Sequence, residues 1–154
     1  MALPDTAKWS DLIISLGDGS TPTENFTASC LLRTDKGISF TTSSSEAPIF
    51  DCTDAAAAAW MERQGTALSA TISGTGKLDL AEFDDWREWM LSMSRKNIQV
   101  EYAVSLGRNG GHFEGPFLLT SFETRGNVED QGGLLMATIE LQSASKLTWT
   151  DASS

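Results

Sequence analysis

The sequence predicts a mainly β protein: an antiparallel β-sandwich or barrel with one flanking α-helix at about 80–94 and a long extended loop at about 41–60. Short segments of alternating apolar and polar residues follow one another along the chain, separated by Gly, Ser, Thr, Asn and Asp. One segment instead has the period of a helix. The 154 residues suffice for one domain, 1–154, with a core at about 9–150 and flexible termini.

The first strand is expected at Asp11 to Leu16, before Gly17-Asp18-Gly19, whose residues are typical of a turn. Two more strands are expected at about 25–33 and 37–42. Later strands are expected wherever alternation returns after a turn sequence. Those later ranges are 66–77, 98–106, 113–124 and 134–143, with a short final strand at 146–150.

The stretch 41–60 is the least regular part of the chain. It begins with a run of Thr and Ser, contains Pro48 and five consecutive alanines, and ends at Trp60. A loop of this length is uncommon in a compact domain. Because Ile49, Phe50 and Trp60 are apolar, we expect a partner to cover it.

The single predicted helix carries apolar residues at every third or fourth position, and therefore on one stripe. Asp79 and Glu82 form a plausible capping pair at its start, and Arg95 and Lys96 complement the negative charge of its end. We expect the stripe to anchor the helix on the sheet; the alternative is a subunit contact through its tryptophans. The stripe comprises Leu80, Phe83, Trp86, Trp89, Met90 and Met93, and Phe83, Trp86, Trp89 and Met90 are the residues expected to pack.

Composition excludes several classes of protein. The formal net charge of -10 disfavours tight binding to nucleic acid or to an anionic membrane. No segment has the pattern of a secretion signal or the length of an apolar membrane span. Two cysteines, Cys30 and Cys52, are too few for a disulfide framework and lack the spacing of a zinc site, so we expect free thiols.

Motifs for chemistry are also weak. The single histidine, His112, follows two glycines and is expected at an exposed turn. The sequence Ser73-Gly74-Thr75-Gly76-Lys77 lacks the first glycine and the final Ser or Thr of a phosphate-binding loop. The acidic residues between Asp79 and Asp85 lie on a predicted helix, unlike a calcium loop. We therefore expect no enzyme, no cofactor and no metal site.

Four segments together resemble one family. The irregular stretch contains Phe50-Asp51-Cys52-Thr53-Asp54, then Trp60 and Gly65, and a strand at 68–76 ends in Ser-Gly-x-Gly before the single helix. A small-residue turn leads to Thr-Ser-x-Glu at 115–123, and an alternating strand at 137–144 ends in Ser-Ala. Their order and spacing over about residues 9–150 resemble the major tail tube proteins of long-tailed, siphovirus-type bacteriophages and of gene transfer agent particles.

The resemblance implies a structural virion protein that forms hexameric rings, which stack into the tail tube and so make the conduit for DNA ejection into the host. The implied partners are further copies of the chain, a tape-measure protein inside the tube, a tail terminator and distal tail or baseplate proteins. DNA would pass transiently and without specificity, and this chain would not insert into a membrane. The implied location is the tail of the virion, after assembly in the bacterial cytoplasm.

The resemblance also assigns surfaces. The loop at 41–60 would contact the neighbouring ring through Ile49, Phe50 and Trp60, because buried aromatic groups dominate association energies. Polar faces of the strands would line the lumen, where carboxylates offer DNA no cation to bind and so prevent adhesion. The candidate lumen residues are Gln99, Glu101, Glu123, Glu140 and Gln142.

The alternative function is a soluble β-sandwich module that binds a glycan or a protein. Such a module would share the strands and the exposed aromatic side chains. Rings or hollow tubes in electron micrographs would favour the tube protein, whereas a persistent monomer that binds a glycan or peptide would favour the module.

Overall fold

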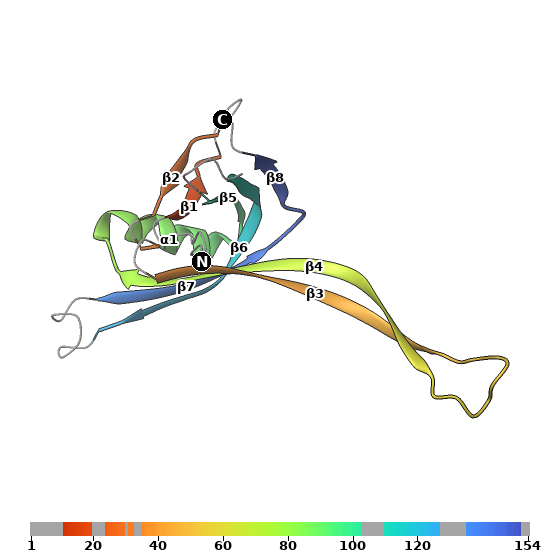
Figure 1. Ribbon diagram of the computed structural model, residues 1–154. Coiled ribbons are helices and arrows are strands. Elements are labelled where there is room, and N and C mark those ends of the chain that lie inside the picture. Colours follow the sequence, from red (N-terminus) through yellow and green to blue (C-terminus); the bar gives the residue numbers. More distant parts are fainter. Residues whose placement is uncertain are drawn as a thin grey trace, which may run out of the picture.

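The computed structural model describes residues 11–19, 24–29, 31–32, 35–102, 110–126 and 135–151, so the termini expected to be flexible lie outside the described residues. Within these ranges the chain forms strands and one helix, and a two-stranded arm extends far from the body (Figure 1). The elements are β1 (Leu12–Gly17), β2 (Phe26–Ala28), β3 (Asp35–Ile49), β4 (Trp60–Lys77), α1 (Leu80–Ser92), β5 (Arg95–Tyr102), β6 (Gly111–Arg125), β7 (Met136–Ser143) and β8 (Thr148–Asp151).

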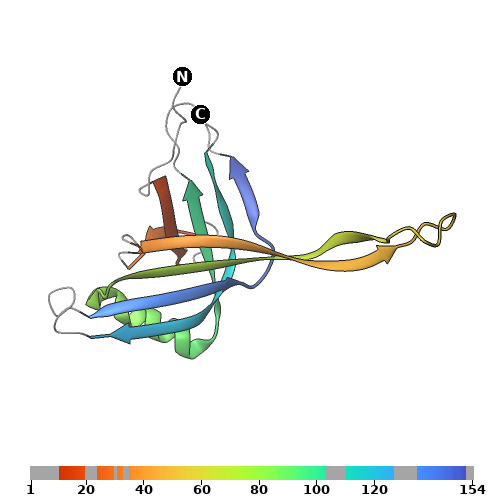
Figure 2. The ribbon, with the colours of Figure 1, turned by 60° about the horizontal axis from the view of Figure 1, so that its bottom comes forward.

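The eight strands form one sheet with antiparallel pairings, in the order β2-β1-β5-β6-β7-β4-β3, and β8 pairs with β6. Strand β6 joins two halves of this sheet, since Gly111 to Leu118 pair with β5 and Phe117 to Arg125 pair with β7. In Figure 2 the axes of β1, β5 and β8 are roughly aligned with one another, and β7, β4 and β3 lie across them. The described residues confirm the predicted antiparallel β fold with one helix, and their strands form an open sheet rather than a closed barrel.

The core lies between the two halves of the sheet and is covered by α1. Alternate residues of the strands point into it, as the period of two predicts, and α1 adds two tryptophans. The buried apolar cluster comprises Ile14, Leu31, Leu32, Ala70, Ile72, Trp86, Trp89, Ile98, Val100, Phe117, Leu119, Ala137, Ile139 and Leu141.

The packing around Gly74 explains the first glycine of the Ser-Gly-x-Gly sequence on β4. Gly74 faces the core, and a Cβ atom there would overlap the side chain of Leu32 and crowd the carbonyl oxygen of Asp35. Ser73 is exposed on the opposite face of the strand. The motif is therefore part of a strand that makes room for a core leucine, and not a phosphate-binding loop.

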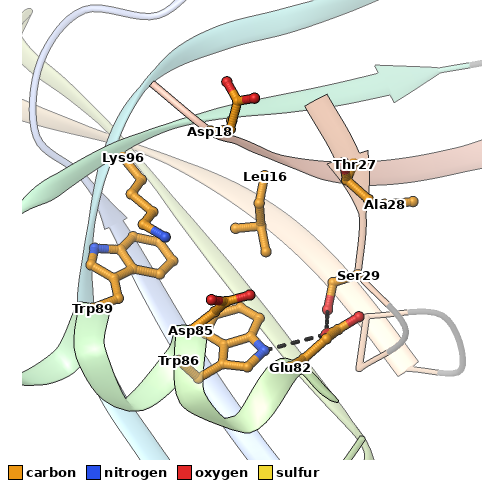
Figure 3. A pocket seen from close by; sticks show the side chains of 11 residues that line it. Leu16, Asp18, Thr27, Ala28, Ser29, Glu82, Asp85, Trp86, Trp89 and Lys96 are labelled. Atoms are coloured by element: carbon orange, nitrogen blue, oxygen red, sulfur yellow. Dashed lines mark hydrogen bonds between the residues drawn. The ribbon is translucent and has the colours of Figure 1, made fainter. Parts of the chain in front are cut away.

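Helix α1 begins as predicted, because the Asp79 carboxylate accepts a hydrogen bond from the N–H of Ala81 at 2.9 Å. The Glu82 carboxylate accepts hydrogen bonds from the hydroxyl of Ser29 at 2.7 Å and from the indole of Trp86 at 3.4 Å (Figure 3). The bond from Ser29 ties α1 to the residue that follows β2.

The middle of α1 carries its packing residues. Trp86 and Trp89 are buried and stack with ring centroids 5.7 Å apart. The Trp86 ring also stacks on the Phe122 ring of β6, with centroids 6.3 Å apart. The centroid of the Phe83 ring lies 6.5 Å from that of Phe122. Met90 is half-buried against the core, so all four expected packing residues lie on the body side of the helix.

The ends of the predicted apolar stripe do not pack. Leu80 is 78% exposed and Met93 is 79% exposed, because the two ends of α1 extend beyond the core. Met93 ends the helix in the left-handed conformation, with φ of 53°. Arg95 and Lys96 belong to β5 rather than to the helix end, and the Lys96 amine lies 5.4 Å from the ring centre of Trp89.

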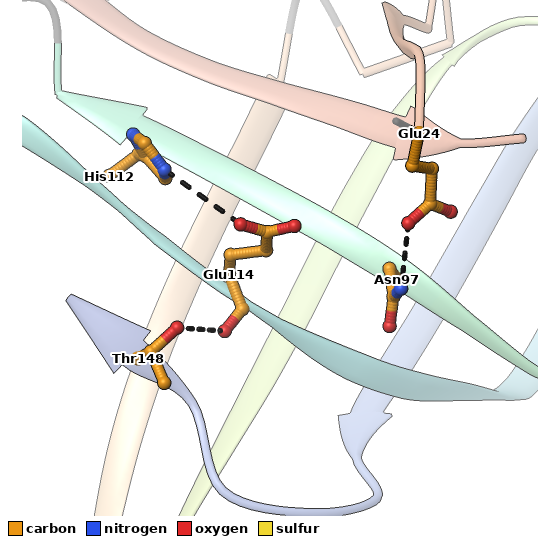
Figure 4. A network of polar contacts seen from close by, with 5 residues as sticks. All are labelled: Glu24, Asn97, His112, Glu114 and Thr148. Atoms are coloured by element: carbon orange, nitrogen blue, oxygen red, sulfur yellow. Dashed lines mark hydrogen bonds and ion pairs between the residues drawn. The ribbon is translucent and has the colours of Figure 1, made fainter. Parts of the chain in front are cut away.

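The prediction of an exposed turn at His112 is wrong. His112 lies inside β6, opposite Glu101 of β5 and Thr150 of β8, and its Nε2 atom is 4.0 Å from the Glu114 carboxylate (Figure 4). The preceding residue, Gly111, also lies in β6, at a position where a side chain would overlap β8. The strand expected at 98–106 is described only as far as Tyr102.

Candidate assembly surfaces

The stretch expected to be a loop, 41–60, is largely a β-hairpin. Strand β3 continues to Ile49 and β4 begins at Trp60, so residues 50–59 alone are unpaired. We term residues 42–68 the arm; Figures 1 and 2 both show it standing clear of the body. The prediction of a loop is wrong for residues 41–49, because their serine-rich sequence pairs with β4, a partner distant along the chain.

Two contacts shape the arm. Thr66 is an extra residue in β4, where the register shifts opposite Ser43 and Ser44, and its hydroxyl donates a hydrogen bond to the Ser43 carbonyl at 3.1 Å. Such a bulge increases the twist of the hairpin. Nearer the end, the Arg63 guanidinium pairs with the Glu46 carboxylate at 2.6 Å across the two strands. The arm is thus an ordered element rather than a flexible loop.

The arm ends in apolar residues on both faces. Ile49 pairs with Trp60 in the last rung, and Pro48 pairs with Met61 in the rung before it. Directly opposite residues in antiparallel strands point to the same side, so each rung presents an apolar pair. Trp60 is 84% exposed, and Phe50, just beyond the ladder, is 69% exposed. Met61 belongs to this apolar end as well, although the sequence-based expectation included only Ile49, Phe50 and Trp60.

Two carboxylates accept hydrogen bonds within the tip of the arm, residues 50–59. The Asp51 carboxylate accepts hydrogen bonds from the hydroxyl of Thr53 at 2.7 Å and from its N–H at 2.8 Å, and these bonds lower the pKa of Asp51 below its ordinary value of 3.8. Asp54 accepts a hydrogen bond from the N–H of Ala56 at 3.1 Å. Cys52 is a free, exposed thiol, and Cys30 lies outside the described residues.

The outer surface of β3, β4, β7 and β6 forms what we term the polar face. Its residues share one side of the sheet, since Asp35 pairs with Thr75, Thr75 with Thr138, and Thr138 with Glu123. The hydroxyls of Thr75 and Thr138 also bond at 3.2 Å. Three carboxylates and two basic side chains lie among mostly Ser, Thr and Gln. The polar face includes Asp35, Ser39, Thr71, Ser73, Thr75, Lys77, Ser121, Glu123, Arg125, Thr138, Glu140 and Gln142.

The five candidate lumen residues do not share one surface. Glu123, Glu140 and Gln142 lie on the polar face, where Glu123 is paired with Arg125 at 2.7 Å. Gln99 and Glu101 lie on β5, opposite Glu114 and His112, in the other half of the sheet. Because the sheet folds over at β6, the outer surfaces of the two halves face different directions (Figure 2).

A cleft of about 380 Å³ opens at the base of the arm. Phe40 and Leu68, on the core-facing side of β3 and β4, line one part of it, and Phe113 and Leu147 line another. Leu68 is 72% exposed, because β4 continues toward the arm beyond Thr71, its last residue paired with β7. Alternation along β4 predicts an apolar side chain at Leu68 but gives no sign that the sheet leaves it uncovered.

Among the residues described here, no group of His, Cys, Asp or Glu side chains is arranged to hold a metal ion. No helix within the described ranges is long and apolar enough to cross a membrane. An ordered arm with an apolar end, an open sheet and a polar outer face define an assembly subunit.

The sequence matches the phage tail tube protein family over residues 6–149. The chain therefore belongs to this family, and it is a structural protein of the tail tube. No curated protein matches the sequence.

Solved structures share the fold. A chain from the tail of an empty gene transfer agent (GTA) particle, refined with C6 symmetry, is 25% identical with a TM-score of 0.71, and the match covers 94% of this chain and 99% of that one. The SPP1 tail tube is 13% identical with a TM-score of 0.64, covering 97% and 81%. The tube-terminating cap of the anti-feeding prophage is 12% identical with a TM-score of 0.63, covering 99% and 95%.

Proposed function

We propose that this chain forms six-fold rings that stack into a tail tube, and that the arm makes the contact between neighbouring rings. The gene transfer agent tail, solved with C6 symmetry, supports the ring, because its chain matches this one over nearly the full length of both. The open sheet supports it as well, since β3 pairs with β4 alone among the described strands and leaves an edge for another chain.

The apolar end of the arm is the observation that carries the proposal. Trp60, Phe50, Ile49 and Met61 are exposed at the end of an element that its own body does not cover. Aromatic side chains bury about 150–250 Å² each at interfaces and contribute much of the binding energy. An isolated subunit leaves this surface in water, whereas contact with another subunit removes it.

We further propose that the polar face lines the bore of the tube. Its hydroxyl and amide groups keep the wall wetted, and its two basic side chains are outnumbered by carboxylates. Low adhesion to DNA then follows from the lack of net positive charge, rather than from the strongly acidic lining that the net charge suggested. Glu123, Glu140 and Gln142 would face the bore, whereas Gln99 and Glu101 would lie elsewhere on the subunit.

The remaining roles are inferred from the family. A tape-measure protein would occupy the bore before DNA passes, and terminator and baseplate proteins would close the two ends after assembly in the host cytoplasm. The anti-feeding prophage cap and baseplate chains share this fold, which supports partners of the same architecture at the ends. We infer that the chain has no enzymatic role, and the family match favours the tube over the glycan- or protein-binding module.

Electron microscopy of the purified protein tests the proposal. Concentrated protein in salt-rich buffer is expected to form rings or hollow tubes with six-fold symmetry. A monomer that persists at every concentration, and that binds a glycan or a peptide, would show that the chain is a binding module instead.

A further inference from the structure

We propose that the cleft at the base of the arm receives the arm end of a second copy of this chain, with Trp60 inserted beside Leu68 and Glu62 facing Lys146. This inference rests on the proposed function, because it names the surface on which the arm docks. Each chain would then carry both the arm that inserts and the cleft that receives an arm.

The cleft has the chemistry and size for an indole ring. Phe40, Phe113 and Leu147 are apolar, and the Phe40 and Phe113 rings lie 5.1 Å apart. A cavity of about 150 Å³ lined by apolar side chains can hold a benzene molecule. The cleft, at about 380 Å³, therefore has room for the larger ring of Trp60.

The arm of the same copy cannot fill this cleft. Trp60 and Leu68 lie on one continuous strand, β4, and are eight residues apart. At about 3.3 Å per residue, this places them roughly 26 Å apart. The ladder between β3 and β4 continues from Thr42 to Ile49, so the arm cannot fold back on its own base. The occupant must come from another copy.

Charge fixes the orientation of the contact. Glu62 lies two residues from Trp60 on the same strand, and therefore on the same face of the arm. Asp51 and Asp54 add negative charge at the tip. Lys146, which is exposed, lines the cleft next to Leu147. An acidic arm end thus matches a cleft with a basic rim, and contacts of this kind favour one register over others.

Charge reversal tests the pairing. Glu62→Lys and Lys146→Glu are each expected to raise the protein concentration needed for half-maximal tube formation by about fivefold, because each places like charges in contact. The double reversal is expected to return it to within about twofold of the original chain. Arg95→Glu, on β5, makes the same charge change as Lys146→Glu at an exposed site outside the cleft and should have little effect.

Cross-linking tests the location. Glu62→Cys with Lys146→Cys, in a chain with Cys30→Ser and Cys52→Ser, should form disulfides between subunits when tubes are oxidised. Non-reducing gels should show a ladder beyond the dimer, because every copy both gives and receives an arm. Replacing Lys146→Cys by Ser73→Cys moves the second thiol to the polar face and should yield no ladder.

Two outcomes would overturn the docking site, and they differ in what else fails. If tubes form but the double reversal remains as weak as the single variants and no ladder appears, the arm docks elsewhere and the proposed tube stands. If the unmodified chain forms neither rings nor tubes, the proposed function fails and the docking site fails with it.

Discussion

Ile49 and Trp60 face each other across the last rung of the β3–β4 ladder, directly before the loop that ends the arm. An apolar cross-strand pair stabilises a hairpin modestly. Trp60 nevertheless remains 84% exposed, so most of its surface is left for another molecule. In the proposed assembly, the same residue therefore takes part in hairpin pairing and in the contact between subunits.

Replacing the apolar end should separate folding from assembly. Phe50→Ser with Trp60→Ser is expected to abolish tubes in electron micrographs while the free energy of unfolding changes by no more than about 0.5 kcal/mol per site, because both residues are exposed. Leu80→Ser with Leu91→Ser removes equally exposed apolar groups from α1 and should leave assembly intact. Unchanged polymerisation of the arm variant would show that stacking depends on other residues.

Positive charge on the polar face should make the tube retain DNA. Ser39→Lys with Ser73→Lys adds two cations to that face, and labelled duplex DNA should then co-sediment with tubes in a salt-dependent manner. Ala81→Lys with Leu91→Lys adds the same charge on exposed helix positions. Equal retention by both variants would mean that the polar face does not line the bore.

Gly74 should not tolerate a side chain. Gly74→Ala is expected to lower the free energy of unfolding by about 1–3 kcal/mol, because the added methyl group meets Leu32 and the backbone at Asp35. Chemical denaturation measures this change. At Gly37 a Cβ atom would meet no neighbour within 4 Å, so Gly37→Ala should be neutral or slightly stabilising. Similar losses at both sites would contradict the packing described for β4.

Substitution of a buried residue of α1 and of the exposed residue that ends it should change the free energy of unfolding in opposite directions. Trp86→Ala is expected to cost about 3–5 kcal/mol in the free energy of unfolding, because it empties the centre of the core. Met93→Gly should stabilise by about 1 kcal/mol, because glycine adopts the left-handed helix end without strain. A destabilising Met93→Gly would indicate that this exposed side chain packs after all.

Acid should loosen the tip of the arm. The Thr53 hydroxyl and N–H bonds hold the pKa of Asp51 below 3.8, so the ionised form is the one that orders the tip. This contribution is present above the unfolded-state pKa and is lost as pH falls through the lowered folded-state value. The Thr53 amide signal in NMR should titrate with a midpoint below 3.8. Asp51→Asn keeps an acceptor oxygen but cannot ionise, so its Thr53 signal should show no such transition.

The strands and the helix could be predicted because their signals are local. Alternation placed β5, β6 and β7, and the spacing of Phe83, Trp86 and Met90 placed α1. Helix ends are less predictable, because burial of Leu80 or Met93 depends on how far the sheet extends beneath them. His112 was misplaced for a related reason: glycines typical of turns also occur where another strand crosses closely.

The arm could be predicted only in part. The apolar residues Ile49, Phe50 and Trp60 signal a contact, but Ser43, Ser44 and Ser45 have no strand character of their own. Their partners on β4 lie 19 to 24 residues further along the chain, and the pairing includes the Thr66 bulge, which no local pattern encodes. The cleft is even harder to predict from the sequence. It forms where the pairing of β4 with β7 ends at Thr71 while β4 itself continues toward the arm.

The proposed docking has a consequence for polarity. Because the arm end and the cleft are different surfaces of the same chain, docking one into the other gives a head-to-tail contact, which does not close on itself in the stacking direction. The two ends of the tube then differ chemically: one displays unfilled clefts and the other displays unpaired arms. A protein that stops growth at one end must supply an apolar, acidic insert, whereas the protein at the opposite end must offer an apolar pocket with a basic rim.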